Sequence, residues 1–487
     1  MFLLLNSTKT EEIVYNVLSR AAKELDCQVY LIGGYVRDKV LGRRSKDIDI
    51  VCVGDGIVLA EYVNNLLNNE HPVVIFKRFG TASIRFKEVE LEFVGARKES
   101  YSIDSRKPSV LAGTLYDDQL RRDFTINAMA ISLNEDTYGE LLDPFDGMEH
   151  LEEKLIKTPL DPGSTFSDDP LRMMRAIRFA NQLNFTIDPN TFQSMTNNCE
   201  RLKIVSIERI MTEFQKIMEC DKPSIGINLL FEAGLLDYFI PELVELHGVE
   251  IQEGKGHKDN FYHTLQVLDN VCKNSDNVWL RWAALLHDIA KPATKRFDDK
   301  QGWTFHGHEA LGAAMVHRMF KRMHLPLDHQ MKYVQKLVRY HLRPISLTKE
   351  DITDSAIRRL LFDAGDDIDD LMILCEADIT SKNERKVKKL LENYELVRLK
   401  LKEIEEKDKM RNWQPPVTGE LIMETFGIKA GPIVGDLKNE IREAILDGDL
   451  ENDFTAAFSF LVDLGEKRGL QRNIKANKHL PNHKRLH

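Results

Sequence analysis

Residues 31–53 read LIGGYVRDKVLGRRSKDIDIVCV, and this stretch decides how the amino-terminal part of the chain folds. The glycine pair Gly33-Gly34 follows an apolar run, and Asp47 and Asp49 lie one residue apart inside a second apolar run. On a strand, residues i and i+2 point to the same face, so the two carboxylates are expected side by side. Like charges this close raise one pKa unless a cation lies between them. The pair is therefore predicted to bind Mg²⁺, beside a glycine turn whose N–H groups can approach a triphosphate.

The composition is that of a globular protein with several domains. The chain has 487 residues, of which 43% are hydrophobic and 30% charged, and its net charge is −10. This balance argues against a generally basic nucleic-acid coat, although a local basic channel stays open. The six cysteines are scattered without a C-x-x-C pair and are expected to be reduced, buried thiols of a cytoplasmic protein. No signal peptide and no apolar run of membrane-spanning length is found, so no membrane partner is expected.

Hydrophobic periodicity predicts an α+β fold: a small amino-terminal head with a mixed sheet, followed by mostly helical segments. Glu92 lies on the last predicted strand, where it could face the aspartate pair as a third carboxylate or occupy a solvated position. The polar segment 95–120 is expected to be a mobile basic loop that closes over an anionic ligand. The predicted helices are 9–26 and 57–67, and the predicted strands are 29–32, 47–53, 73–76, 82–86 and 89–94.

A dense polar cluster, RRDFTINA, occupies residues 121–128. The guanidinium forks of Arg121 and Arg122 suit phosphate, and Asp123 can accept a hydrogen bond from a ribose hydroxyl. The alternative is a helix start with Asp123 near its N-terminus. The nearby aspartate pair favours the nucleotide interpretation, in which Asn127 belongs to the same site.

A second informative stretch, DDPLRMMRAIRF, occupies residues 168–179. Asp168 or Asp169 can cap a helix whose first turn holds Pro170, and Arg172, Arg175 and Arg178 then follow one face of that helix. An aspartate and an arginine one helical step apart could present an acceptor and a donor fork to the edge of a base. From this stretch alone, a capped helix with a solvated arginine face is a serious competing interpretation.

Histidines are concentrated in the third quarter of the chain. A lone histidine is usually structural, but several of them around an adjacent His-Asp pair predict a site for one or two divalent metals. The residues are His263, His287, Asp288, His306, His308, His341 and Asp378. Further along, residues 386–411 are predicted to form a solvated long helix. The last 21 residues hold seven Lys/Arg and no acid, and are expected to be a disordered tail that contacts nucleic-acid phosphates.

Taken in order, these motifs resemble class II CCA-adding enzymes (tRNA nucleotidyltransferases) and their relatives, the bacterial poly(A) polymerases. LIGGYVRDKVLG with KDIDIV resembles the family's nucleotidyltransferase motif, RRDFTINAMA its ribose motif, and DDPLRMMRAIRF its nucleobase-reading motif; residues 257–380 resemble HD domains. The resemblance implies a nucleotidyltransferase head at 1–145 and a helical neck at 146–250. An HD domain at 251–380 and a helical body with a basic tRNA-binding tail at 381–487 would follow.

The resemblance also implies roles for individual residues. Asp47 and Asp49 would hold Mg²⁺ and activate the tRNA 3′-hydroxyl. Asp168 stands where the family usually has Glu, which puts only that residue's role in doubt. The nucleotide-binding residues implied are Gly33, Gly34, Arg37, Arg121, Arg122, Asp123, Asn127, Asp169, Arg172, Arg175 and Arg178. The HD-site ligands implied are His263, His287, Asp288, His308, His341 and Asp378.

The expected activity is template-independent addition of C, C and A to the tRNA 3′ end from CTP and ATP, with release of pyrophosphate. Three alternatives remain open. The first is poly(A) polymerase, and the second is a CC-only or A-only enzyme. The third is a metal-dependent phosphohydrolase whose main activity is at His287-Asp288, acting on phosphomonoesters or cyclic 2′,3′-phosphates.

Overall fold

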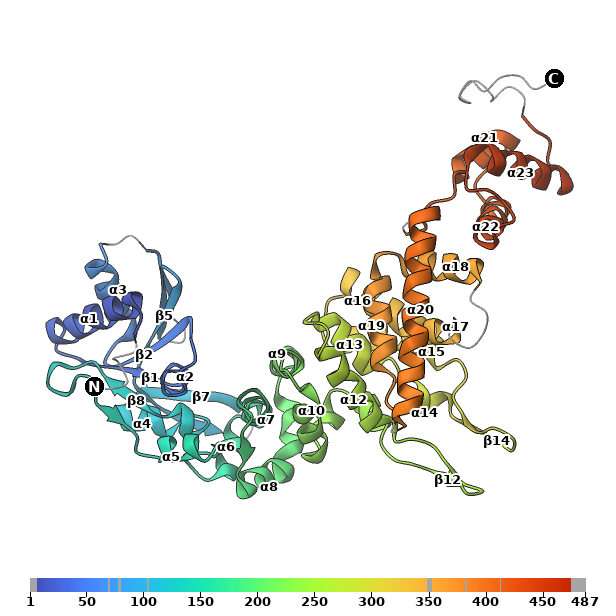
Figure 1. The fold of residues 1–487 in the computed structure, drawn as a ribbon. Helices are drawn as coiled ribbons and strands as arrows, with labels where there is room; N and C mark the ends of the chain where they lie inside the picture. Colours follow the sequence, from blue (N-terminus) through green and yellow to red (C-terminus); the bar gives the residue numbers. More distant parts are fainter. Residues whose placement is uncertain are drawn as a thin grey trace. The chain divides into compact units, whose positions relative to one another are not determined.

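The computed structural model describes residues 7–68, 71–77, 80–102, 105–347, 353–381, 383–411 and 413–473. The chain forms two compact units, residues 1–244 and 245–487 (Figure 1). Most of the predicted basic tail, residues 474–487, lies outside the described residues.

A seven-stranded mixed sheet forms the first part of unit one, in the order β3-β4-β5-β2-β1-β8-β9. Its central strands β1, β2 and β5 are almost fully buried on one or both faces because Val, Ile and Leu alternate or run together in them. β2 pairs antiparallel with β1 and parallel with β5. The strands are β1 (Gln28–Ile32), β2 (Asp47–Val53), β3 (Val73–Phe76), β4 (Thr81–Phe86), β5 (Val89–Gly95), β8 (Ala130–Ser132) and β9 (Leu141–Leu142).

Helices cover the sheet and then continue as a helical segment. α1 (Lys9–Glu24) begins at a capping box formed by Thr8 and Glu11 and packs against α3 (Gly56–Leu66). The head helices and the α+β class are as predicted from periodicity. The remaining helices of unit one are α2 (Gly34–Val40), α4 (Leu115–Leu120), α5 (Gly147–Glu152), α6 (Pro162–Asp168), α7 (Leu171–Leu183), α8 (Pro189–Asn198), α9 (Ile207–Met218), α10 (Pro223–Glu232) and α11 (Pro241–Val244).

The expectation of a basic loop at 95–120 was wrong. The segment forms an antiparallel hairpin of β6 (Arg97–Ser102) and β7 (Ser105–Ala112), followed by α4. Backbone pairing between its two arms holds the segment, and such pairing needs no apolar side chains. Residues 103 and 104 lie outside the described residues.

Unit two is helical, with two small hairpins. The predicted long helix at 386–411 is confirmed as α20. The hairpins are β12 (Ile251–Gln252) with β13 (Lys255–Gly256), and β14 (Arg296–Asp298) with β15 (Gly302–Thr304). The helices are α12 (Asn260–Cys272), α13 (Val278–Leu286), α14 (Lys291–Thr294), α15 (His308–Arg322), α16 (His329–Tyr340), α17 (Arg343–Leu347), α18 (Asp354–Ala364), α19 (Ile368–Ala377), α20 (Glu384–Asp408), α21 (Gly419–Phe426), α22 (Pro432–Asp447) and α23 (Phe454–Lys467).

All six cysteines are free thiols, as expected from their spacing. Only Cys52 and Cys375 are buried, so the expectation that the thiols are generally buried was wrong for the other four. Among the described residues, no helix has the length and apolar character needed to cross a bilayer.

Candidate active site and metal centre

Gly33, Asp49 and Arg122 meet where β1 ends and α2 begins. Gly33 precedes α2 with φ +80° and ψ −142°, a conformation that favours glycine. A Cβ at this position would lie 2.6 Å from Arg122 Nη1 and 3.1 Å from Asp49 Oδ2. Glycine is therefore required both by the backbone angle and by the close approach of the two charged groups.

Asp47 and Asp49 lie on the same face of β2, as predicted. Glu92 on β5 is the register partner of Asp49. Burial raises the pKa of Asp49; Arg122 opposes this and Asp47 adds to it. Burial, followed by the negative charges of Asp49 and Asp47, raises the pKa of Glu92 as well. These acids therefore favour a cation, although among the described residues they do not form a group of three with oxygens within 4.8 Å of one another.

Asp118 is a site residue that sequence reasoning missed. Its fully buried carboxylate pairs with Arg121 at 2.5 Å and with Arg122 at 3.2 Å. Burial opposes its charged form, but the guanidinium groups of Arg122 and Arg121 outweigh burial and lower its pKa. Asp118 therefore orients both arginines of the RRD motif. Its spacing of three and four residues from them on a helix is the signal that could have identified it.

Asp123 is the centre of a hydrogen-bond network. Its Oδ2 accepts from Arg175 Nε at 2.7 Å, and its Oδ1 accepts from Asn127 Nδ2 at 3.0 Å. Asn127 Oδ1 in turn accepts from Arg37 Nη1 at 2.8 Å. Burial raises the pKa of Asp123, but Arg175, Asn127 and Arg172 outweigh burial and lower it. The network connects α2, the RRD motif and α7 into one rigid site.

The start of α7 places the predicted base-reading pair. Asp169 Oδ1 accepts from the N–H of Leu171 at 3.2 Å, although Asp169 precedes the N-cap position and is not itself the capping residue. Pro170 is the N-cap residue and not part of the first turn, and Asp168 is the last residue of α6. Arg172 Nη2 donates to the carbonyl oxygen of Arg121 at 2.6 Å. Residues 169–172 and 121–123 therefore lie together although about fifty residues separate them.

The arginine face of α7 is not simply solvated. Arg178 is buried and pairs with Glu213 of α9 at 2.5 Å. The Cζ atoms of Arg178 and Arg37 lie 3.9 and 4.8 Å from the ring centre of Phe179, a cation–π arrangement. Neither Phe179, the last residue of the DDPLRMMRAIRF stretch, nor Glu213 was predicted as a site residue, because their partners Arg37 and Arg178 lie on other helices.

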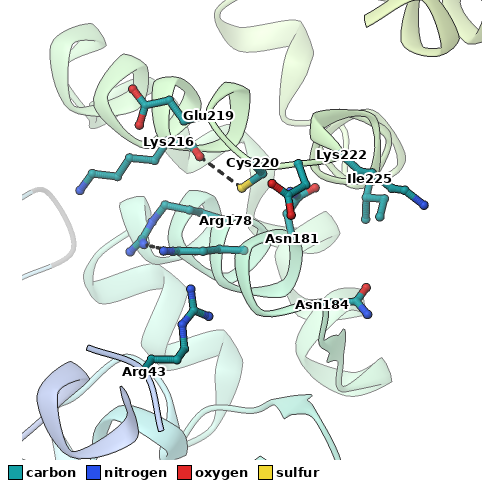
Figure 2. A pocket seen from close by; sticks show the side chains of 11 residues that line it. Arg43, Arg178, Asn181, Asn184, Lys216, Glu219, Cys220, Lys222 and Ile225 are labelled. Atoms are coloured by element: carbon teal, nitrogen blue, oxygen red, sulfur yellow. Dashed lines mark hydrogen bonds between the residues drawn. The ribbon is translucent and has the colours of Figure 1, made fainter. Parts of the chain in front are cut away.

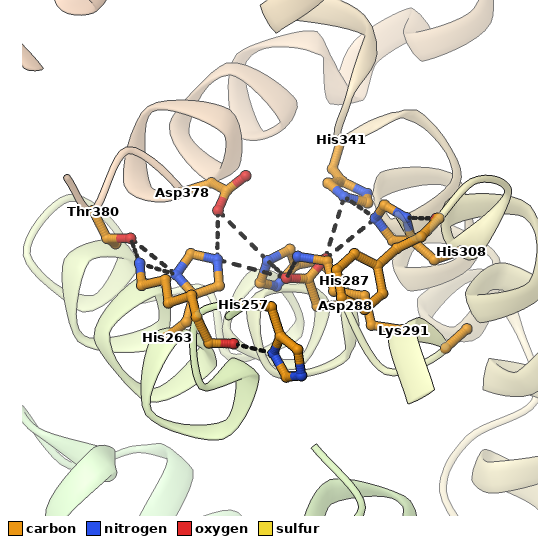
Figure 3. Close-up of polar contacts among 12 residues, drawn as sticks. His257, His263, His287, Asp288, Lys291, His308, His341, Asp378 and Thr380 are labelled. Atoms are coloured by element: carbon orange, nitrogen blue, oxygen red, sulfur yellow. Dashed lines mark hydrogen bonds and ion pairs between the residues drawn. The ribbon is translucent and has the colours of Figure 1, made fainter. Parts of the chain in front are cut away.

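In unit two, six of the seven predicted ligands converge (Figure 3). Most of them occupy helix ends. His308 is the first residue of α15. The C-cap residues of α13, α16 and α19 are His287, His341 and Asp378, respectively. His306 is exposed and belongs to neither candidate ligand group of the described residues, so its inclusion in the set was wrong.

The six ligands divide into two groups around Asp288. One group is His263, His287 and Asp378, and the other is Asp288, His308 and His341. Asp288 Oδ2 lies 3.2 Å from His287 Nε2, whereas Asp288 Oδ1 lies 3.3 Å from His308 Nε2. The two oxygens of Asp288 thus face different sets of imidazoles.

The imidazoles are oriented for ligation. The Nδ1 atoms of His287, His308 and His341 donate to backbone carbonyl oxygens of Ala284, Phe305 and Val338 at 2.7–2.8 Å. This leaves each Nε2 directed into the cluster, the arrangement that fixes a ligand tautomer in metal sites. His287 Nε2 is buried without a hydrogen bond of acceptable geometry. The donor set therefore fits a divalent metal.

The electrostatics of the cluster also favour a bound divalent metal. Burial opposes protonation of His287, but Asp288 and Asp378 outweigh it and raise its pKa. Burial, together with the charge on His287, lowers the pKa of His341 to about 4. The raised pKa favours a proton on His287, whose charge compensates the carboxylates of Asp288 and Asp378. A bound divalent cation would neutralise these carboxylates in place of that proton.

Lysines approach both sides of the cluster. Lys291 Nζ pairs with Asp288 Oδ2 at 2.5 Å. Lys258 Nζ lies 2.9 Å from His263 Nδ1, and it also bonds Thr380. A phosphate bound at the cluster would therefore meet positive charge next to the ligands.

Comparison with protein families finds three matches along the chain. Residues 29–157 match the family described as "Poly A polymerase head domain", and residues 184–246 match "Probable RNA and SrmB- binding site of polymerase A". Residues 260–383 match "HD domain".

Similar curated proteins cover most of the chain. A "Multifunctional CCA protein" of Shewanella frigidimarina is 31% identical over 378 residues, which are 73% of this chain and 84% of that protein. An "A-adding tRNA nucleotidyltransferase" of Deinococcus radiodurans is 29% identical over 430 residues, 86% of this chain and 92% of that protein.

Solved structures share the fold. The Thermotoga maritima CCA-adding enzyme complexed with tRNA is 22% identical and aligns with a TM-score of 0.60 over 95% of this chain and 97% of that one. A CCA-adding enzyme with CTP is 23% identical and gives a TM-score of 0.63 over 95% and 97%.

Proposed function

The chain belongs to the family of CCA-adding tRNA nucleotidyltransferases that carry a poly(A)-polymerase-type head and an HD domain, and we propose that it adds C, C and A to the 3′ end of tRNA. The substrates are CTP, ATP and a tRNA acceptor end, and pyrophosphate is released. A cytoplasmic location is part of the proposal, and the free cysteines of the chain support it.

One observation carries this proposal: a single site joins acids, a glycine turn and the start of α7, where we place the base-reading residues. Asp49 stands beside Gly33, Asp47 lies two residues before Asp49 on β2, and Arg122 reaches the same turn. The hydrogen bond from Arg172 to the backbone of residue 121 connects these groups to α7. A carboxylate site alone would fit many phosphoryl-transfer enzymes, whereas acids joined to an Asp-Arg pair fit a polymerase that selects nucleotides with protein side chains.

The proposed roles follow from position and charge. Asp47 and Asp49 hold Mg²⁺, which when bound neutralises phosphate charge and lowers the pKa of the attacking 3′-hydroxyl. Gly33, Gly34 and Arg122 position the triphosphate by backbone N–H groups and a guanidinium fork.

The selection residues are connected to one another. Asp123 accepts from the ribose 2′-hydroxyl, with Asn127 and Arg175 fixing its orientation. Asp169 and Arg172 present an acceptor and a donor fork to the edges of C and A. The remaining predicted residues, Arg37, Arg121 and Arg178, hold this frame together through their bonds with Asn127, Asp118 and Glu213.

We assign the head to residues 1–145, the neck to 146–250, the HD domain to 251–380 and the tRNA-binding body to 381–487. Relatives named "Multifunctional CCA protein" and "A-adding tRNA nucleotidyltransferase" both match this chain. The products of addition therefore decide between complete, CC-only and A-only enzymes, and unlimited A tails would identify a poly(A) polymerase.

The test uses tRNA transcripts that lack the 3′ CCA, incubated with CTP, with ATP or with both. Addition of two residues with CTP and of three with both nucleotides is expected. Replacing Asp47 or Asp49 by Ala should abolish transfer, since the acids provide the metal site. The matched control is Glu61→Ala, an exposed acid on α3. Full transfer activity in Asp49→Ala would refute the role given to that residue.

A second activity is favoured by the divided ligand cluster of unit two. We infer that this cluster binds two divalent ions with Asp288 between them and hydrolyses phosphomonoesters or cyclic 2′,3′-phosphates. Two cations about one shared carboxylate are a recurring arrangement in phosphatases and nucleases. The observation behind this inference is that the two Asp288 oxygens face separate pairs of histidines.

Metal content tests this inference independently of activity. The metal-free chain dialysed against Mn²⁺ or Ni²⁺ should retain two ions in unit two, and the double variant His308→Ala/His341→Ala should retain one. His306→Ala is the matched control, because His306 is exposed and lies two residues from His308. Equal metal content in the double variant and the control would contradict the two-ion site. Hydrolysis of p-nitrophenyl phosphate and of 2′,3′-cyclic AMP then measures the activity.

A further inference from the structure

Tyr35 is the second residue of α2 and connects the glycine turn with α1. It is almost fully buried, and its hydroxyl donates to Glu11 Oε1 at 2.5 Å. The hydroxyl of Tyr15 forms a hydrogen bond with that of Tyr35. Glu11 and Tyr15 both belong to α1 and lie four residues apart, on one face of the helix. The match to the head-domain family begins at residue 29, so both partners of Tyr35 lie outside it.

The Glu11 carboxylate is a shared anchor for two side chains of α2. Lys39 Nζ lies 3.1 Å from Glu11 Oε2, and Lys39 follows Tyr35 by four residues, on the same face of α2. Burial opposes the charged form of Glu11. Hydrogen bonds from Tyr35 and Thr8 outweigh burial, together with the charge of Lys39, and lower the pKa of this carboxyl. The charged carboxylate therefore holds α2 against α1.

The main chain of Tyr35 approaches the acids of β2. Burial raises the pKa of Asp49, and the backbone N–H of Tyr35 opposes this rise by a hydrogen bond to the carboxylate. A Cβ at Gly33 would lie 3.1 Å from Asp49 Oδ2, so the turn and the acid are in close contact. The first N–H groups of a helix have no partner within the helix, which leaves this one for a carboxylate. One residue thus contacts the acid by its main chain and α1 by its side chain.

The carboxyl-terminal end of α2 has few neighbours. Arg43, three residues after the helix, is exposed and lines a cavity of about 770 Å³ with Arg178 (Figure 2). Nothing lies within 4 Å of the Cβ position of Gly42. With seven residues, α2 is too short to be stable without tertiary contacts. Its position therefore depends on contacts along its length, among them those of Tyr35 with α1.

We propose that Tyr35 is a positioning residue for nucleotidyl transfer, which holds the glycine turn against Asp49 because α1 holds its hydroxyl. This inference rests on the proposed nucleotidyl transfer. Tyr35 acts through the turn and the acid. Loosening the turn would misplace both its N–H groups and the acid, and a misplacement of about 1 Å at a reacting centre can reduce the rate about 100-fold.

The test compares Tyr35→Phe with the wild-type chain and with Tyr62→Phe. Tyr35→Phe keeps the buried ring and removes only the hydroxyl that α1 holds. Tyr62→Phe is the matched control, because the hydroxyl of Tyr62 on α3 also donates to a glutamate of α1, Glu24, at the other end of that helix from Glu11. Initial rates of CMP addition, KM for CTP and Kd for a labelled tRNA transcript are measured at a temperature where all variants are folded.

Tyr35→Phe should lower kcat for CMP addition several-fold and leave Kd for tRNA unchanged, since the residue fixes the reacting centre and not the RNA. Amide hydrogen exchange of residues 33–36 should be faster in Tyr35→Phe than in Tyr62→Phe. Equal kcat values in the two variants would overturn the inference. A raised Kd for tRNA with unchanged exchange of the turn would overturn it as well.

A double-mutant cycle tests the connection through α1. Glu11→Ala removes the acceptor of the Tyr35 hydroxyl, so its loss of rate should not add to that of Tyr35→Phe in the double variant. Thr8→Ala is the control for helix capping, because it removes the side-chain bond to the N–H of Glu11 and leaves the carboxylate in place. Additive losses, or an equal loss in Thr8→Ala, would overturn the role of α1. Hydrogen exchange needs no catalysis, so a wild-type chain that adds no nucleotide would refute the proposed function, while the exchange rates would still decide whether Tyr35 holds the turn.

Discussion

Replacing Gly33 by Ala tests the geometry at the start of α2 most directly. The new Cβ would lie 2.6 Å from Arg122 Nη1 and 3.1 Å from Asp49 Oδ2, so the arginine must move and the acid is crowded. Gly42→Ala is the matched control. Gly42 also has a positive φ, +67°, but nothing lies within 4 Å of its Cβ position.

Two terms contribute to the loss of folding stability in these variants: the cost of the backbone conformation and the loss of side-chain contacts. Gly33 has φ +80° and ψ −142°, a positive-φ region outside the left-handed helix, where a non-glycine residue costs about 1–3 kcal/mol, whereas a left-handed backbone such as that of Gly42 costs about 1–2 kcal/mol. Displacing Arg122 weakens its 3.2 Å ion pair with buried Asp118, and a charged hydrogen bond contributes about 1.5–3 kcal/mol. Gly33→Ala should therefore destabilise unit one by about 3–5 kcal/mol, against about 1–2 kcal/mol for Gly42→Ala.

Gly33→Ala should reduce the rate of nucleotidyl transfer by more than its loss of folding stability suggests. A misplacement of about 1 Å at a reacting centre can reduce the rate about 100-fold. Initial rates of CMP addition to tRNA measure this effect at a temperature where both variants are folded.

Stability of unit one is followed by hydrogen exchange of residues 28–53, because all four tryptophans lie in unit two. A Gly33→Ala rate within twofold of the Gly42→Ala rate would refute the inferred contact between the turn and the acids.

Three further outcomes are expected. Asp118→Ala should destabilise unit one by about 3–5 kcal/mol in chemical denaturation, because it leaves Arg121 and Arg122 without their buried partner; a loss below about 1 kcal/mol would contradict this pairing. The folded-state pKa of Asp123 is lowered from 3.8, so its stabilisation is complete above that pH and is lost as the pH falls below it. Asp123→Asn should therefore flatten the acid limb of a stability–pH curve, and an unchanged limb would exclude the network. A divalent metal at 100 times its Kd should stabilise unit two by about 2.7 kcal/mol in calorimetry, and Asp288→Asn should lose this gain; equal stabilisation of that variant would place the ion elsewhere.

Much of the head and of both sites could be predicted from local patterns. The period-two alternation around Asp47 and Asp49 gave the correct strand, and helical spacing gave the correct face for Arg172 and Arg175. Segment 95–120 was missed because its strands are held by backbone pairing with each other, which hydrophobic periodicity does not detect. His306 was included wrongly because sequence proximity to His308 does not show which side chain turns inward.

The sequence by itself determined which chemical groups this protein carries, since two acids after a glycine turn, an RRD motif and an HD pair are local features. Only the tertiary structure decided how those groups are paired. Glu213 neutralises Arg178 from another helix, and Asp288 divides its two oxygens between histidines on different helices. Ion pairs form between groups that the packing of distant segments brings within a few ångströms, and no local periodicity encodes that distance.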